Sequence, residues 1–304
     1  MKLFPFRVLH SALGEVNMGL RRRLARVSGF VAMALFLGCS SAPKPKEFPD
    51  DYSAKEIRDM GSKLLGAGEA GRALKILSMA LEKDKTDPET HYYFGLAYSA
   101  RGLEDKALEH FRIAVELDRD YSEVYNAMGV LHARKGNVSE ARGAFEKALS
   151  NPFYDTPHYA LFNLGRLYEK CGDNEKALAQ YREALRLEAS YPMAYYRMGR
   201  VLESMGRRDE ARNAYGEAVY YDSNNAEAQF HYGRLCFLTG DQDRAYDALS
   251  QVVLIKPRTN LARAAREYLQ KIEQARMPPP EPAYGYPFPS PYDNPFESPY
   301  EYGY

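Results

Sequence analysis

Apolar and polar residues follow the period of an amphipathic helix along most of the chain, and this pattern recurs about every 34 residues from Ala54 to Thr259. The clearest unit runs from His158 to Tyr191. Each unit has a glycine at its eighth position, an alanine twelve residues later and a bulky residue four positions after that. The glycines are Gly61, Gly95, Gly129, Gly165, Gly199 and Gly233, the alanines are Ala73, Ala107, Ala141, Ala177, Ala211 and Ala245, and the bulky residues are Leu77, Phe111, Phe145, Tyr181, Tyr215 and Leu249. Antiparallel helices approach closely only beside such small residues, so we predict that each unit is a helical hairpin.

This spacing resembles that of the tetratricopeptide repeat (TPR) family, as do turns such as Lys135-Gly136-Asn137 and Gly172-Asp173-Asn174. The usual Trp at position four is replaced, for example by His91. The resemblance implies an all-α solenoid of six hairpins over residues 54–259. Residues 260–276 form a further amphipathic pattern, which we expect to be a helix that caps the last hairpin.

The first 38 residues have the pattern of an export signal, in which several arginines precede the apolar run Phe30 to Leu37. The run ends Phe36-Leu37-Gly38-Cys39, which resembles the bacterial lipobox. That resemblance implies a covalent lipid on Cys39 and a protein held at the periplasmic face of the outer membrane, with residues 39–53 as the tether. An ordinary secretory signal or a membrane helix is the alternative. We expect translation to start at Met18, because a short basic segment follows it directly; a start at Met1 with a long n-region is the alternative.

The segment 277–304 differs from the rest of the chain, because it contains nine prolines, eight aromatic residues and four acids but no Lys or Arg. Proline at this density excludes helix and sheet, so we predict a disordered tail. Two interpretations stand: a recognition strand that presents rings and carboxylates, or a solvated spacer.

Composition and motifs exclude several functions. From Cys39 onward the chain has 35 basic and 40 acidic residues, which makes nucleic acid an unsuitable partner. Three cysteines are too few for a disulfide scaffold, and we expect Cys171 and Cys236 to be free thiols, with Cys236 in the core. The six histidines form no metal-binding spacing, and no phosphate-binding glycine loop is present. We therefore predict that the protein is not an enzyme and needs no cofactor.

Stacked TPR hairpins leave the first helix of each unit lining a groove, and the groove positions are read from the repeat register. Those positions hold Tyr92, Asn126, Phe162, Asn163, Arg166, Tyr196, Arg197, Arg200, Phe230 and Arg234. Arg166, Arg200 and Arg234 share position nine of consecutive units, so we expect an acidic or aromatic peptide to bind beside them. Their alternative role is pairing with Glu169, Glu203 and Glu227. The chain's own tail has the composition of such a peptide, and we expect it to contact the groove.

Successive glycines of the repeat are 34 residues apart except between Gly129 and Gly165, where the spacing is 36 and the extra residues fall within Asn151 to Pro157. This insertion, the repeat number and the lipobox together resemble the PilF/PilW family of type IV pilus biogenesis lipoproteins, over residues 39–275. The resemblance implies a partner among the pilus secretin subunits and a role in secretin assembly. The alternative is a TPR lipoprotein scaffold for peptidoglycan hydrolases or other cell-envelope machinery.

Overall fold

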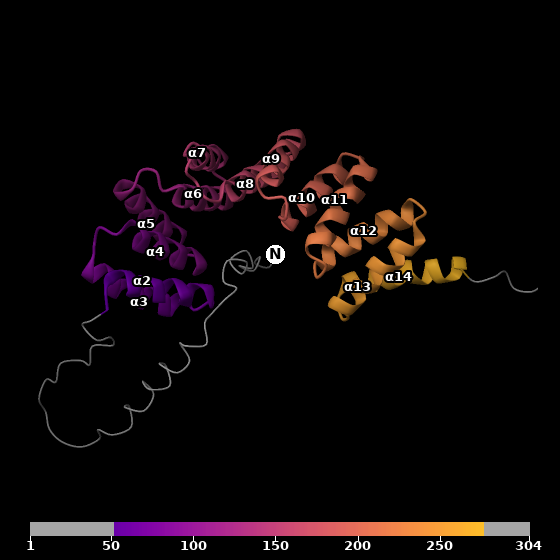
Figure 1. Ribbon diagram of the computed structural model, residues 1–304, viewed down its shortest axis with the longest axis horizontal. Coiled ribbons are helices and arrows are strands. Elements are labelled where there is room, and N and C mark those ends of the chain that lie inside the picture. Colours follow the sequence, from indigo (N-terminus) through magenta and orange to yellow (C-terminus); the bar gives the residue numbers. More distant parts are fainter. Residues whose placement is uncertain (1–51, 277–304) are drawn as a thin grey trace, which may run out of the picture. The chain divides into compact units, whose positions relative to one another are not determined.

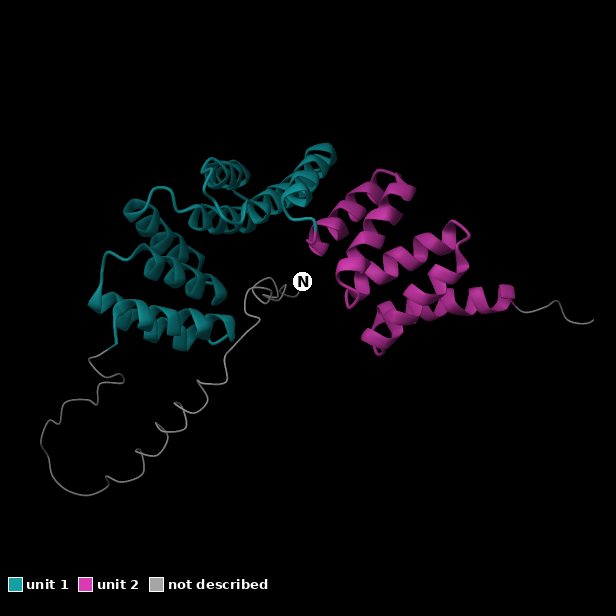
Figure 2. Cartoon of the chain, in the orientation of Figure 1, with its two compact units in different colours: residues 1–189 teal, residues 190–304 magenta. Residues whose placement is uncertain are grey.

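The computed structural model describes residues 52–276 of the 304-residue chain, and every regular element in this range is an α-helix. The helices divide into two compact units, one ending at Ala189 and the other beginning at Ser190 (Figures 1 and 2). The predicted signal segment, Cys39 and the tail 277–304 lie outside the described residues.

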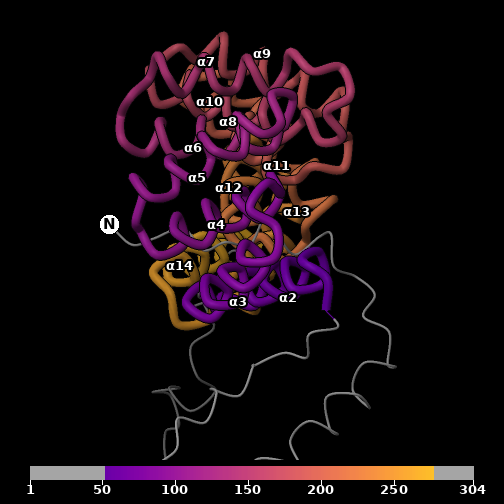
Figure 3. Tube along the Cα trace, turned by 90° about the vertical axis from the view of Figure 1, so that its left-hand side faces the viewer, coloured from indigo at the N-terminus to yellow at the C-terminus, as the bar shows by residue number. Residues whose placement is uncertain are grey.

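The first unit consists of four helical hairpins. Its helices are α2 (Ala54–Gly66), α3 (Ala70–Lys83), α4 (Pro88–Ala100), α5 (Glu104–Leu117), α6 (Ser122–Lys135), α7 (Val138–Leu149), α8 (Pro157–Lys170) and α9 (Asn174–Leu187). The two helices of each hairpin pack together, and the first helices of successive hairpins also contact one another, α2 with α4, α4 with α6 and α6 with α8 (Figure 3). The four first helices therefore form a continuous row.

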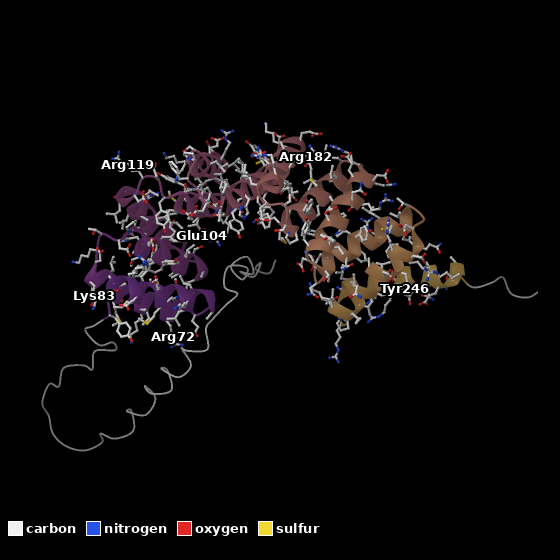
Figure 4. The ribbon with its side chains drawn as sticks, in the orientation of Figure 1. Arg72, Lys83, Glu104, Arg119, Arg182 and Tyr246 are labelled. Carbon is white, nitrogen blue, oxygen red and sulfur yellow. The ribbon has the colours of Figure 1, made fainter. Side chains whose placement is uncertain are left out.

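The second unit contains two hairpins and a final helix. Its helices are α10 (Pro192–Ser204), α11 (Arg208–Tyr221), α12 (Ala226–Leu238), α13 (Gln242–Ile255) and α14 (Asn260–Arg276). Helix α14 packs on both α12 and α13, and its Ile272 is fully buried in a cluster with Cys236. At its end, the guanidinium of Arg276 lies 5.2 Å from the ring centroid of Tyr246, which is labelled in Figure 4. The described residues thus contain the six predicted hairpins and the capping helix.

The repeat glycines are needed for the contact between the two helices of a hairpin. A Cβ atom added at Gly95 would lie 2.3 Å from Cε1 of Phe111, and one at Gly129 would lie 2.5 Å from Cε1 of Phe145. Both distances are far inside van der Waals contact. The bulky residue of each unit therefore occupies the space that the missing side chain leaves, as the sequence pattern predicts.

The turns and helix starts follow from local residue chemistry. Gly136 and Gly172 lie in the predicted turns with φ of 84° and 80°, a left-handed conformation that favours glycine. Pro157 begins α8, where a missing backbone N–H has no cost. The carboxylate of Asp173 accepts a hydrogen bond of 3.3 Å from the backbone N–H of Lys176 and so caps the start of α9.

The two cysteines within the described residues are free, as predicted. Cys236 is fully buried, whereas Cys171 is exposed at the end of α8. Burial raises the pKa of the Cys236 thiol, so this residue behaves as a small apolar side chain in the core.

His91, at position four of the second hairpin, lies in a histidine pair that the sequence did not reveal. Its ring is 5% exposed, and its Nδ1 lies 3.1 Å from Nδ1 of His110 on α5. The ring of His110 stacks on Phe94 with 4.7 Å between centroids. Burial, and then the neighbouring His91, lower the pKa of His110, while Glu109 acts in the opposite direction. The folded unit therefore favours the neutral form of His110.

We expect His110 to make stability fall in mild acid. Since the pKa of His110 is lower in the folded state, the unfolded chain binds protons first and unfolding is favoured as the pH drops below about 6.5. The His110→Phe variant keeps the stack on Phe94 and should show a smaller loss of stability between pH 7.5 and pH 5.5. Urea unfolding at both pH values measures the difference. Equal losses in the variant and the parent protein would show that His110 does not couple folding to protonation.

Candidate partner-binding surface

The predicted groove residues all lie on first helices of hairpins, but they divide between the two units. Tyr92 is on α4, Asn126 on α6, and Phe162, Asn163 and Arg166 on α8 of the first unit. Tyr196, Arg197 and Arg200 are on α10, and Phe230 and Arg234 on α12, of the second. The arginines at position nine therefore belong to two separately described surfaces, one with Arg166 and one with Arg200 and Arg234.

Two groove asparagines of the first unit meet across neighbouring hairpins. Nδ2 of Asn163 donates a hydrogen bond of 3.0 Å to Oδ1 of Asn126. The bond joins α8 to α6, so a side chain at position six of one hairpin meets a side chain at position five of the hairpin before it. Phe162 lies deeper, since it is only 5% exposed and its ring centroid is 5.8 Å from that of Tyr181. The exposed guanidinium of Arg166 covers it at 5.8 Å from the ring centroid.

Tyrosines gather beside Asn126 at the second and third hairpins of the first unit. The ring centroid of Tyr92 is 5.3 Å from that of Tyr93 and 5.3 Å from that of Tyr121. Tyr154 joins them from the loop between α7 and α8, and burial raises its pKa to about 12, with the Glu123 carboxylate adding to the rise. Of these tyrosines, only Tyr92 was among the groove residues predicted from the sequence.

The insertion Asn151 to Pro157 is held by the hydrogen bonds of Asn151 and by the packing of Tyr154. Nδ2 of Asn151 donates to the backbone oxygen of Asp120 at 2.9 Å and to Oγ of Ser122 at 3.1 Å, while its Oδ1 accepts from the backbone N–H of Phe153 at 2.9 Å. Tyr154 is 7% exposed and packs with Ala148 and Ala160, whereas Phe153 is 87% exposed. The longer spacing in the sequence marks this insertion, but the sequence does not indicate which of its rings is buried.

In the second unit, Glu203 of α10 forms the centre of a polar network. Its carboxylate pairs with Arg234, accepts a hydrogen bond of 3.1 Å from the hydroxyl of Tyr215, and lies 3.3 Å from Nδ1 of His231. Burial, the largest single influence, favours the neutral acid, but these partners together hold the pKa of Glu203 below its ordinary value. Arg234 therefore has the alternative role of pairing with a glutamate, because its guanidinium is engaged by Glu203 of the preceding hairpin. Glu227 pairs instead with Lys256, at 2.7 Å.

Arg200 has different surroundings from Arg234. Its side chain is exposed on α10, and among the residues of the described range it has no hydrogen-bond or ion-pair partner. Tyr196 lies one helical turn before Arg200 on α10, and its ring centroid is 5.9 Å from that of Tyr215 and 6.1 Å from that of His231. An exposed guanidinium beside rings can bind a carboxylate and an aromatic side chain of a partner.

Sequence reasoning missed Arg58, which occupies position five of the first hairpin. The residue is 7% exposed, with Nη1 2.9 Å from Oδ2 of Asp87 and Nη2 2.7 Å from Oε2 of Glu89. This guanidinium joins α2 to the first turn of α4, so its role is in stacking the hairpins. A basic residue at a groove position gives no sequence signal that separates this role from ligand binding.

The described residues contain neither a metal-binding cluster nor a membrane-spanning helix. Between residues 52 and 276 no group of three or more His, Cys, Asp or Glu side chains is arranged to hold a metal ion. In the same range no helix combines the length and the apolar character that a bilayer crossing requires.

Comparison with known proteins supports the repeat assignment. A TPR repeat model matches residues 165–206, and a second tetratricopeptide repeat model matches residues 196–257. The chain has the tetratricopeptide repeat fold. Curated relatives share this fold over a limited length: a probable UDP-N-acetylglucosamine–peptide N-acetylglucosaminyltransferase SPINDLY of Hordeum vulgare is 30% identical over 129 residues, which are 41% of this chain and 14% of the relative. Tetratricopeptide repeat protein 8 of Homo sapiens is 34% identical over 103 residues, 33% of this chain and 18% of the relative.

Solved TPR structures match a larger share of the chain. The pilF protein of Pseudomonas aeruginosa superposes with a TM-score of 0.62 at 22% identity, covering 70% of this chain and 98% of pilF. PilW, described as a widely conserved type IV pilus biogenesis factor, gives a TM-score of 0.62 at 21% identity with the same coverage. At these identities the likeness establishes a shared fold.

Proposed function

We propose that this TPR protein is a non-enzymatic adaptor that binds partner proteins through the first helices of its hairpins. The observation that carries the proposal is the exposed Arg200, one helical turn after Tyr196 on α10, at a position where hairpin packing does not require a charge. The Asn126–Asn163 bond supports it, because side-chain amides on a row of first helices can also bind the backbone of an extended peptide.

We propose further that the adaptor acts in type IV pilus biogenesis, where it promotes assembly of the secretin. Three features support this role. The chain shares its fold with almost the whole length of pilF and PilW. It contains an insertion braced by Asn151 and Tyr154, and its sequence around Cys39 resembles a lipobox, which would anchor the protein at the periplasmic face of the outer membrane.

Deletion of the gene should reduce surface pili and secretin multimers while secretin monomers remain. Chromosomal Cys39→Ala should move the protein into the soluble periplasmic fraction and remove labelling by a fatty-acid probe. Immunoblots of unheated envelope extracts measure the multimers, and re-expression of the parent gene is the control. Normal multimers and normal motility in the deletion strain would contradict the pilus role and leave a scaffold for peptidoglycan hydrolases as the role to test.

The tail has a place in this proposal as a ligand that competes with the partner. Residues 277–304 offer four acids, many aromatic rings and no basic residue, and they follow α14 directly. We propose that this segment binds the surface around Arg200 in the second unit until a partner displaces it. Attachment to the same chain gives an effective concentration in the millimolar range, so even a weak contact would be populated.

A further inference from the structure

The tyrosine cluster of the first unit, formed by Tyr92, Tyr93, Tyr121 and Tyr154, includes the residue that precedes α6, and the first turn of that helix carries a carboxylate without a counter-charge among the described residues. Glu123 lies two residues after Tyr121 in the first turn of α6 and is half-buried. Burial is the main cause that raises the pKa of Tyr92, Tyr121 and Tyr154, and the charge of Glu123 adds to the rise at each of the three. Within the described range Glu123 forms no hydrogen bond and no ion pair through its side chain.

Two phenol groups of the cluster also have unused hydrogen-bonding capacity. Tyr92 and Tyr121 are half-buried with their rings in contact, and neither hydroxyl bonds to another side chain or backbone group among residues 52–276. Packing accounts for the rings, since the centroid of Tyr92 is 6.1 Å from that of Phe111 and both tyrosines pack against the core between α5 and α6. Packing does not account for hydroxyls that are partly removed from water without a partner.

The neighbouring cation does not neutralise Glu123. Arg58 acts electrostatically on Tyr93 of the cluster, but its guanidinium is already engaged by Asp59, Asp87 and Glu89. Glu123 itself has a structural use, because an acid in the first turn favours the start of a helix. That use needs only a carboxylate near the helix end and does not require several tyrosines around it.

We propose that the tyrosine cluster and Glu123 bind a basic side chain, lysine or arginine, of a partner protein. The carboxylate supplies the opposite charge, the free phenol oxygens accept hydrogen bonds from the cation, and the ring faces add cation–π attraction. The occupant comes from another protein rather than from the tail, because residues 277–304 contain no Lys or Arg. This inference rests on the proposed adaptor role and assigns the partner a basic residue at the first unit.

Binding is tested with two capped amino acids, Nα-acetyl-lysine amide and Nα-acetyl-norleucine amide, which share a four-carbon stem and differ in the ammonium group. The full chain, labelled with ¹⁵N, is titrated with each compound to millimolar concentration while backbone and asparagine side-chain amide signals are followed. We expect the lysine compound to shift the signals of α4, α6 and Asn126, and the norleucine compound to leave them unchanged. Capped arginine is a second cationic probe.

The variants separate recognition of a cation from a structural role. Glu123→Gln should weaken lysine binding about fivefold or more, and Tyr121→Phe, which removes only a hydroxyl, should weaken it by a smaller factor. Glu116→Gln is the matched control, because Glu116 is an exposed glutamate of α5 in the same unit. Circular dichroism checks that each variant is folded. Equal binding of lysine and norleucine, or unchanged lysine affinity in folded Glu123→Gln, would overturn the proposal. Because the assay uses purified protein, a failure of the pilus role would leave its result intact.

Discussion

Replacing Gly95 with alanine should destabilise the first unit by about 1–3 kcal/mol, the usual cost of adding atoms to a packed core. The new Cβ would lie 2.3 Å from Cε1 and 2.4 Å from Cδ1 of Phe111, and the ring cannot rotate away freely because Phe111 is 1% exposed. Alanine is otherwise the better helix former, so its intrinsic propensity opposes the loss. Urea or thermal unfolding of the purified protein measures the change in the free energy of unfolding.

Gly143→Ala provides a control with the same chemistry and the opposite sign. Gly143 lies within α7, is exposed, and has no atom within 4 Å of the position its Cβ would take. The substitution should therefore stabilise the protein by about 0.5–1 kcal/mol through helix propensity alone. The difference between the two variants isolates the steric term. A Gly95→Ala protein as stable as Gly143→Ala would show that hairpin packing adjusts without cost, and the explanation of the repeat glycines would fail.

The hairpins were predictable because the determinants of the TPR fold are local and repeated. The repeat glycine and the bulky residue are sixteen positions apart in every unit, as with Gly129 and Phe145, so the same contact recurs six times along the chain. The turn at Gly136 and the cap at Asp173 depend only on residues within a few positions. A periodic signal of this kind remains readable even where individual positions change, as with His91 in place of the usual Trp.

The partners of the groove side chains were not predictable in the same way. Arg200 and Arg234 occupy the same position of consecutive hairpins, yet Arg234 is paired with Glu203 while Arg200 is exposed. The difference depends on which long side chain reaches which neighbour in space, and the repeat register gives only the helix face. The insertion shows the same limit, since Tyr154 is buried and the adjacent Phe153 is exposed. Which ring turns inward depends on the hydrogen bonds of Asn151 to Asp120 and Ser122, which are about 30 residues distant.

The ion pair between Arg234 and Glu203 decides which arginine is suitable for testing the tail interaction. Charge reversal at Arg234 would place a second carboxylate beside Glu203 and would also remove a partner of a half-buried acid, so a loss of binding could result from local unfolding. Arg200 has an exposed side chain, so its reversal alters the surface charge with little effect on packing. Arg263, exposed on α14 in the same unit, supplies a control with an equal change in net charge.

A synthetic peptide of residues 293–304 should bind the protein truncated after Arg276 and should bind the full chain more weakly, because the attached tail competes for the same surface. The peptide carries three acidic side chains and a terminal carboxylate, so its affinity should fall as salt increases. Arg200→Glu should weaken binding about tenfold or more, the effect expected when one charge-assisted contact becomes a repulsion, whereas Arg263→Glu should leave it nearly unchanged. Fluorescence anisotropy with a labelled peptide measures its affinity for the truncated protein, the full chain and the two arginine variants. If the peptide fails to bind at millimolar concentration, or if the two arginine variants bind it equally, residues 277–304 serve as a spacer or bind a different protein.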